Sequence, residues 1–193
     1  MAINIVRWAT LRPASWKNGG GTAVDILTAP PRASVEDFDW RVNVATVARS
    51  GPFSDYPGVD RDFRVLDGGD VELAVEGSSR RTLLAGGAAY RFPGDRPTFA
   101  QLVDEAEPCR AFNVLTRRGR ITRDVCELVI GSPRTLWPTG TVLVGIVQCG
   151  SIGVGPDATP ERLGTLDAFV TSESVEVELY GEARLLLVQI AEV

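Results

Sequence analysis

The chain has 193 residues, of which 44% are hydrophobic and 23% charged, a composition typical of a folded globular protein. That composition excludes disordered, collagen-like and coiled-coil proteins. The net charge of -5 argues against DNA or RNA as the main partner, because binding to phosphates needs a surplus of cationic side chains. The sequence contains no histidine, which excludes Ser-His-Asp and Cys-His nucleophile systems and every histidine-containing zinc or iron site.

The sequence predicts a cytoplasmic protein. No stretch approaches the roughly 18 apolar residues that a membrane span requires, and residues 1–6 lack the basic and then apolar start of a secretory signal. Cys109, Cys126 and Cys149 are too few and too far apart for a CxxC motif, and their odd number suits a reducing compartment. We interpret all three as small, buried side chains.

Short β-branched or apolar runs, cut by Gly, Pro and Asp, recur along the chain at the spacing of all-β folds. Residues 67–70, Asp-Gly-Gly-Asp, predict a hairpin turn, and residues 150–155 a further hairpin. Only residues 34–38 give a weak helix signal, because 20 glycines and 12 prolines leave few windows that could sustain a helix. In chain order, the predicted strands are 3–8, 23–28, 40–47, 63–66, 71–75, 98–103, 111–116, 124–130, 142–148, 168–170, 175–179 and 184–190.

A dozen strands need a second layer to cover their apolar faces, which leaves a sandwich or a barrel as the architecture. Residues 131–139, which include two prolines, predict a joint between a larger lobe, 1–130, and a smaller lobe, 131–193. No flexible linker separates them, so we expect the two lobes to share one core.

The densest motif is a glycine-rich segment near the amino terminus. Three successive glycines beside a lysine and an asparagine can bring backbone N–H donors close to an anion. The alternative interpretation is a flexible turn, although a tryptophan and the only lysine of the chain are unusual in a mere turn. The segment consists of Trp16, Lys17, Asn18, Gly19, Gly20, Gly21 and Thr22.

A second motif is the turn-rich loop of residues 50–61, which contains Phe53, Ser54 and Asp55 and ends at Arg61. Loops of this length either bind ligands, often as a lid, or pack as structural Ω-loops. Arg61 and Arg41, the latter in the preceding predicted strand, can point guanidinium groups inward, although arginines on strands are more often solvated.

A third motif surrounds Asn113, which lies between apolar neighbours on a predicted inner strand. A buried amide there must bond either the backbone or a ligand. The arginines around Gly119 are interpreted either as a solvated turn or as a carboxylate clamp. Residues 90–95 predict a strand followed by a sharp turn, which Asp95 caps.

The segments WKNGGGT, DWRVNVATVARSGPFSDYPGVDR, RFPGD and FNVLTRRG resemble, in order and spacing, the HutD/Ves family over residues 7–118. The resemblance implies an all-β, cupin-like fold, a compact bicupin with two joined barrels, that is often dimeric. It also implies a cytoplasmic bacterial protein associated with histidine utilisation. Such proteins are expected to bind a small acid such as urocanate or formylglutamate, without an established enzymatic activity.

Position by position, the whole segment from Trp16 to Thr22 matches the first block of the family. Two positions depart from the family pattern, Ala111 before Phe-Asn and Leu115 after Asn-Val. Cupins commonly hold a metal with histidines, so the lack of histidine predicts a cavity without a metal or another cofactor. Five residues match polar or aromatic positions of the later blocks: Arg41, Phe53, Ser54, Arg61 and Asn113.

The leading hypothesis is a metal-free, cupin-like protein that binds a small carboxylic acid through Lys17, the glycine amides and one or both of Arg41 and Arg61. The alternative is a metal-independent isomerase or hydrolase of a small organic acid, with Lys17 as general base or Asp55 as acid. A third possibility is a protein-interaction subunit with a vestigial cavity. The predicted partner is thus a small carboxylate, with a homodimer as an option left open and with neither nucleic acid nor membrane.

Overall fold

The computed structural model describes residues 3–16, 19–34, 36–156, 158–172 and 175–193. These residues form seventeen β-strands and one short 3-10 helix, η1 (Trp8–Thr10), so the predicted all-β class is confirmed. The chain folds into two compact units, one of residues Leu11–Arg120 and one that joins Met1–Thr10 to Ile121–Val193. Within the described residues, no helix is long and apolar enough to cross a membrane.

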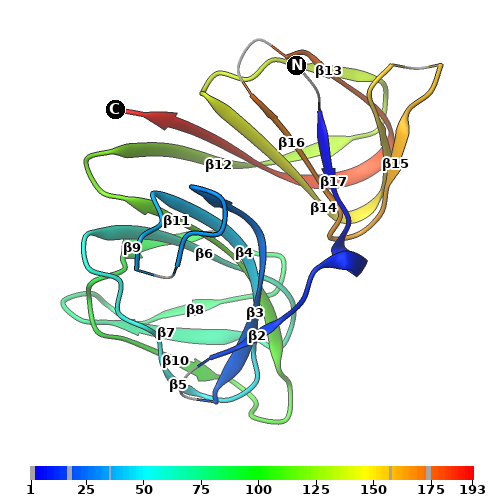
Figure 1. Cartoon of the computed structure of the whole chain (residues 1–193). Helices are drawn as coiled ribbons and strands as arrows, with labels where there is room; N and C mark the ends of the chain where they lie inside the picture. The colour runs from blue at the N-terminus through cyan, green and yellow to red at the C-terminus, as the bar shows by residue number, and fades with distance from the viewer. Residues whose placement is uncertain (1–2, 17–18, 35, 157, 173–174) are drawn as a thin grey trace. The chain divides into compact units, whose positions relative to one another are not determined.

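The unit of residues 11–120 consists of two sheets, which lie as two layers in Figure 1. The first sheet has the order β2-β3-β4-β11-β6-β9, formed by Ala14–Ser15, Gly21–Ala29, Trp40–Val47, Cys109–Arg117, Val59–Gly68 and Tyr90–Pro93. The second has the order β5-β10-β7-β8, formed by Gly51–Pro52, Thr98–Leu102, Val71–Val75 and Arg81–Leu83. Apolar side chains of both layers, among them Phe63, Val65, Leu73 and Leu102, pack into one core between the sheets.

The other unit is built on a single seven-stranded sheet with the path β1-β16-β14-β17-β12. Strand β13 pairs with β17, and β15 pairs with β14. Its core gathers apolar side chains of β14, β15, β16 and β17, all of which belong to this sheet. The strands are Asn4–Val6, Ala168–Ser172, Val142–Val154, Val177–Glu192, Ile121–Ile130, Arg134–Leu136 and Glu161–Leu163.

The strand pairings of the described residues give open sheets, without a pairing that closes either unit into a barrel. The expected pair of closed barrels is therefore not seen in the pairing pattern. The cupin-like character of the fold follows from the comparisons given below, and the two-barrel arrangement stays a prediction.

Several expectations from the sequence are corrected. Residues 34–38 form a turn in their described part, in which the Ser34 carbonyl accepts from the Asp37 amide, and no helix is found there. The predicted strands 175–179 and 184–190 are parts of the single strand β17, whose Gly181 (φ 117°) stays paired with Ile152. Residues 150–154 continue β14, and the turn of the hairpin with β15 follows them.

The boundary between units also differs from the one placed near residue 131. Strand β12 (Ile121–Ile130) pairs with β17 over its whole length, so residues 121–130 belong with the carboxy-terminal unit. Among the cysteines, only Cys109 is buried, whereas Cys126 and Cys149 are exposed. Cys126 lies on a strand whose residues are mostly exposed, so its strand position does not bury it.

Candidate functional site

A cavity of about 490 Å³ lies in the unit of residues 11–120. Its floor is one face of the six-stranded sheet, contributed by β3, β4, β6 and β11, and its wall is the loop that follows β5. The residues that line it are Ala14, Ser15, Trp16, Ala23, Glu36, Arg41, Asn43, Ala45, Phe53, Ser54, Asp55, Tyr56, Pro57, Val59, Arg61, Asn113, Leu115 and Arg117.

Strand alternation brings the polar floor residues onto one face. Leu115 of β11 pairs with Arg61 of β6 on one side and with Arg41 of β4 on the other. Two residues earlier on β11, Asn113 pairs with Asn43 of β4. Because side chains two residues apart on a strand share a face, these positions all point into the cavity. The small side chains of Ala23 and Ala45, which also line it, leave the space above the sheet unfilled.

Arg61 is the most unusual side chain of the floor. The residue is only 6% exposed, and its guanidinium lies 4.2 Å from the ring centroid of Phe53 and 5.3 Å from that of Phe63. Burial lowers the pKa of Arg61 to about 10, with a small opposing effect of nearby Tyr56. Among the described residues, no carboxylate forms an ion pair with this guanidinium. Arg61 therefore carries a buried positive charge for which the described residues supply no carboxylate.

The buried amide of Asn113 holds the Arg61 guanidinium, and the amide of Asn43 supports Asn113. Nε and Nη2 of Arg61 both donate to Oδ1 of Asn113, at 2.8 and 2.6 Å. The side-chain amide of Asn113, which is 1% exposed, donates in turn to Oδ1 of Asn43 at 3.1 Å and to the carbonyl of Ala111 at 3.3 Å. The polar partner expected for Asn113 is thus another side chain of the floor, together with the backbone.

Arg41 lies beside this network and, unlike Arg61, forms an ion pair with a carboxylate. Its Nε and Nη2 donate to the two carboxylate oxygens of Asp25, and the second of these bonds is 2.7 Å long. The pair is bidentate, so Asp25 neutralises Arg41 within the protein. Of the two predicted arginines, only Arg61 offers an uncompensated charge to the cavity.

Aromatic residues form the wall above the floor. Phe53 contacts Trp16 edge-on, with ring centroids 6.1 Å apart and an interplanar angle of 86°. Arg117 donates to the carbonyl of Pro57 in the loop that follows β5, and to the carbonyls of Phe38 and Glu36 in the connection between β3 and β4. Arg117 therefore ties the end of the wall loop to a neighbouring connection of the same unit.

Arg118 forms the carboxylate clamp that was one of the two interpretations of the turn at Gly119. Its guanidinium pairs with Asp60 at 2.8 Å and with Asp95 at 2.9 Å. The ion pair lowers the pKa of Asp95 to about 2. Asp95 also accepts from the backbone N–H of Gly58 at 3.2 Å, in a different turn from the one at residues 90–95 that it was expected to cap. The clamp binds carboxylates of the protein itself and fastens the end of the loop.

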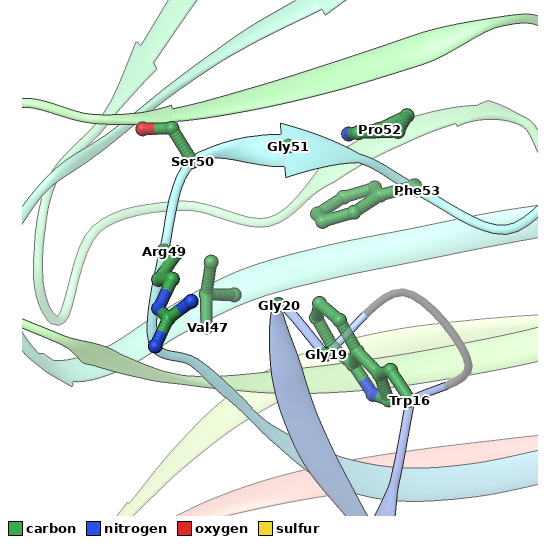
Figure 2. A pocket seen from close by; sticks show the side chains of 9 residues that line it. All are labelled: Trp16, Gly19, Gly20, Val47, Arg49, Ser50, Gly51, Pro52 and Phe53. Atoms are coloured by element: carbon green, nitrogen blue, oxygen red, sulfur yellow. The ribbon is translucent and has the colours of Figure 1, made fainter.

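The glycine-rich segment borders a second, smaller cavity of about 120 Å³, shown in Figure 2. Trp16 and Phe53 line both cavities, and Gly19, Gly20 and Arg49 line only the smaller one. The amide of Gly19 donates to the carbonyl of Trp16 at 3.0 Å, so this N–H is already used. Figure 2 labels the residues of this smaller cavity, among them Trp16, Gly19 and Gly20 of the segment, with the ring of Phe53 above them in this view.

The structure brings together six of the predicted site residues at the larger cavity: Trp16, Arg41, Phe53, Ser54, Arg61 and Asn113. Gly21 and Thr22 belong to β3 and line neither cavity. A Cβ atom on Gly21 would lie 2.1 Å from the carbonyl oxygen of Thr46, so close packing requires glycine there. Lys17 and Asn18 lie outside the described residues.

Sequence reasoning missed Asn43, Tyr56 and Arg117 as lining residues. The signal for Asn43 was present, since it lies two residues after Arg41 on the same predicted strand and must share its face. Arg117 also follows this alternation, since it lies four residues after Asn113 on β11, but the predicted strand ended at residue 116. Tyr56 had no such signal, because a loop has no fixed side-chain periodicity.

The donor set of the larger cavity does not fit a resident metal ion. Its buried polar floor consists of two guanidinium groups and two amides, and guanidinium groups repel a metal cation. Among the described residues, no group of three or more Cys, Asp or Glu side chains is arranged to bind a metal. The floor instead offers hydrogen-bond donors and one positive charge, a combination that binds anions.

Comparison with known proteins places the chain in a family. The family model of HutD matches residues 8–187. Protein Ves of Cronobacter sakazakii is 36% identical over 132 residues, which are 68% of this chain and 67% of that protein. Protein Ves of Citrobacter koseri is also 36% identical, over 105 residues, so the chain spans about half the length of that relative (53%).

Solved structures agree with this assignment. A conserved protein of unknown function from Pseudomonas aeruginosa PAO1 superposes with a TM-score of 0.87 at 25% identity, covering 99% of this chain and 100% of the other. HutD from Pseudomonas fluorescens SBW25 gives 0.82 at 24% identity, with complete coverage of both. A cupin 2 conserved barrel domain protein from Leptotrichia buccalis shares the fold at a TM-score of 0.63 and 11% identity, with 92% of each chain covered. The chain, with its cupin-like β fold, therefore belongs to the HutD family.

Proposed function

We propose that this protein binds a small carboxylic acid in the larger cavity, with the guanidinium of Arg61 as the anchor. One observation carries the proposal: a buried arginine faces a cavity and has no carboxylate partner among the described residues. A buried charge without a counterion is costly, so proteins rarely retain one unless a ligand supplies the opposite charge. An acid that binds Arg61 would complete the ion pair.

The size and lining of the cavity support a small, partly unsaturated acid. A volume of about 490 Å³ lies within the range of small-molecule sites, roughly 300–1,000 Å³. The aromatic rings of Trp16, Phe53 and Tyr56 offer faces on which a planar ligand can stack. Urocanate and formylglutamate have the carboxylate that Arg61 would take, and urocanate also has the planar ring.

The same proposal includes a regulatory role in histidine utilisation, in which occupancy of the cavity reports the level of the acid. Each charge-assisted hydrogen bond is worth about 1.5–3 kcal/mol. Two or three of them with some apolar contact give micromolar affinity, which suits a metabolite sensor. A two-barrel arrangement and a homodimer accompany this proposal as expectations from the family.

Isothermal titration with urocanate and with formylglutamate tests the proposal. We expect the wild type to bind at least one acid at micromolar concentration and Arg61→Met to bind it at least ten times more weakly. Lys17→Ala, which removes the predicted second cation, is also expected to weaken binding at least tenfold.

The matched control is Arg110→Met. Arg110 lies on the same strand as Asn113 but pairs with Asp67 away from the cavity, so its loss should leave binding unchanged. Equal binding by the wild type and Arg61→Met would contradict the proposal.

A further inference from the structure

We infer that Asn113 is a positioning residue, which holds the Arg61 guanidinium through a neutral acceptor so that its charge stays available to the ligand. The inference rests on the proposed function and adds to it the reason why Arg61, and not Arg41, takes the acid. The difference between the two arginines lies in the side chain that accepts their hydrogen bonds, which is a carboxylate for one and an amide for the other.

Arg61 and Arg41 present the same edge to two different acceptors. In both residues, Nε and Nη2 donate to one side chain across the sheet. For Arg41 that side chain is the carboxylate of Asp25, and for Arg61 it is the amide oxygen of Asn113. The geometry of the hydrogen bonds is similar, but only the carboxylate cancels the positive charge.

The Asn113 amide is fixed in the orientation that this role requires. Its Nδ2 group donates to Oδ1 of Asn43 and to the carbonyl of Ala111. If the amide were flipped, its NH2 group would face the donors of the Arg61 guanidinium, and its oxygen would face these two acceptor oxygens. At 1% exposure, Asn113 has almost no contact with bulk solvent. Asn43 thus supports Asn113, and Asn113 supports Arg61.

The remaining edge of the guanidinium is left for a ligand. With Nε and one hydrogen of Nη2 bonded to Asn113, no protein acceptor for Nη1 of Arg61 is found in the described part of the chain. Nη1 and the second hydrogen of Nη2 form the end-on face of the fork, which can bind both oxygens of a carboxylate. Phe53 covers one face of the plane, so the approach is confined to the cavity side.

Two substitutions that preserve side-chain size exchange the acceptors. Asn113→Asp gives Arg61 an internal counterion, so titration should show urocanate binding at least tenfold weaker than in the wild type. Asp25→Asn releases the charge of Arg41 into the cavity, so the affinity for formylglutamate, which carries two carboxylates, should rise at least threefold. Structural damage can weaken binding but cannot increase affinity. Asp25→Asn is therefore the more informative of the two substitutions.

A second measurement needs no ligand. In the presence of Arg61, the new carboxylate of Asn113→Asp is paired but cannot make the two hydrogen bonds that Nδ2 of Asn113 donates, so the substitution should lower the melting temperature by less than it does without Arg61. In an Arg61→Met background, the same substitution leaves a buried carboxylate without a partner and should lower the melting temperature by about 6 °C or more. Thermal unfolding of these four proteins forms a double-mutant cycle at fixed pH.

The outcomes separate this inference from the proposed function. Asn113→Asp that binds urocanate within threefold of the wild type, or that lowers the melting temperature equally in both backgrounds, would overturn the positioning role. A wild type that binds neither acid would overturn the proposed function, and the thermal cycle would still decide whether Asn113 leaves Arg61 uncompensated.

Discussion

Replacement of Arg61 by methionine should abolish acid binding with little loss of stability. The reason lies in the cost of the buried charge. Burial lowers the pKa of Arg61 to about 10, and such a depression corresponds to about 3 kcal/mol of unfavourable free energy for the charged form in the folded state. Methionine fills most of the same space without a charge.

The substitution also removes favourable contacts. Oδ1 of Asn113 loses both donors, which costs about 1–3 kcal/mol for a buried acceptor. The interactions with the rings of Phe53 and Phe63 contribute about 1–2 kcal/mol more. Gains and losses nearly cancel, so we expect the free energy of unfolding of Arg61→Met to lie within about 2 kcal/mol of the wild type, well below the 3–5 kcal/mol typical of truncating a buried aromatic side chain.

Urea denaturation at pH 7, analysed by linear extrapolation, measures this difference. The sign of its pH dependence is also fixed. A base whose pKa is lowered by folding destabilises the protein while it is charged in both states, and this penalty is relieved as the pH rises above about 10. Above pH 10, the free energy of unfolding of the wild type should therefore rise relative to that of Arg61→Met. A loss greater than about 4 kcal/mol at pH 7 would refute the reasoning, because it would mean that the protein itself stabilises the charge.

Three further predictions concern other parts of the molecule. Gly21→Ala should lower the free energy of unfolding by about 1–3 kcal/mol in urea denaturation, because its Cβ atom would lie 2.1 Å from the carbonyl oxygen of Thr46. Arg118 lowers the pKa of Asp95 to about 2, so Asp95→Asn should lower the melting temperature at pH 5–7, with the difference disappearing as the pH falls towards 2. Burial raises the pKa of Cys109 to about 11, so a thiol-specific disulfide reagent at pH 8 should modify the other two cysteines in the native protein and Cys109 only after unfolding.

Each of these predictions has a control or a contrary result. Gly51→Ala introduces a Cβ atom with no neighbour within 4 Å and should cost little, so an equal loss at both glycines would contradict the packing argument. For Asp95→Asn, a difference that persists unchanged at pH 2 would show that the ion pair is not its source. Simultaneous modification of all three cysteines would contradict the burial of Cys109.

The strands were the most predictable part of the fold, because alternation of apolar and polar residues is a local property. Strand β4, Trp40–Val47, was predicted with its observed ends, as was β7, Val71–Val75. Strand β17 was predicted in two pieces, because Gly181 and its neighbours interrupt the apolar run. Pairing with β14 carries the strand through this interruption, and such a partner is invisible to a local pattern.

The candidate site was predictable in its residues and not in its chemistry. The motifs pointed to Arg41, Arg61 and Asn113, and all three line the same cavity. The motifs gave no reason to prefer one arginine over the other. Asp25, which decides the state of Arg41, had not been singled out, since an aspartate in a half-exposed strand has no distinctive signal.

The amino-acid sequence by itself determined the all-β class, the HutD family and the small set of polar residues from which a binding site could be built. These properties depend on composition, on alternation and on motifs that are continuous in the chain. The tertiary structure alone decided which guanidinium has a carboxylate partner and which has an amide, because an ion pair acts over a few ångströms between side chains on neighbouring strands. Asp25 lies 16 residues from Arg41 and Asn113 lies 52 from Arg61, and only the register of the sheet brings each pair together.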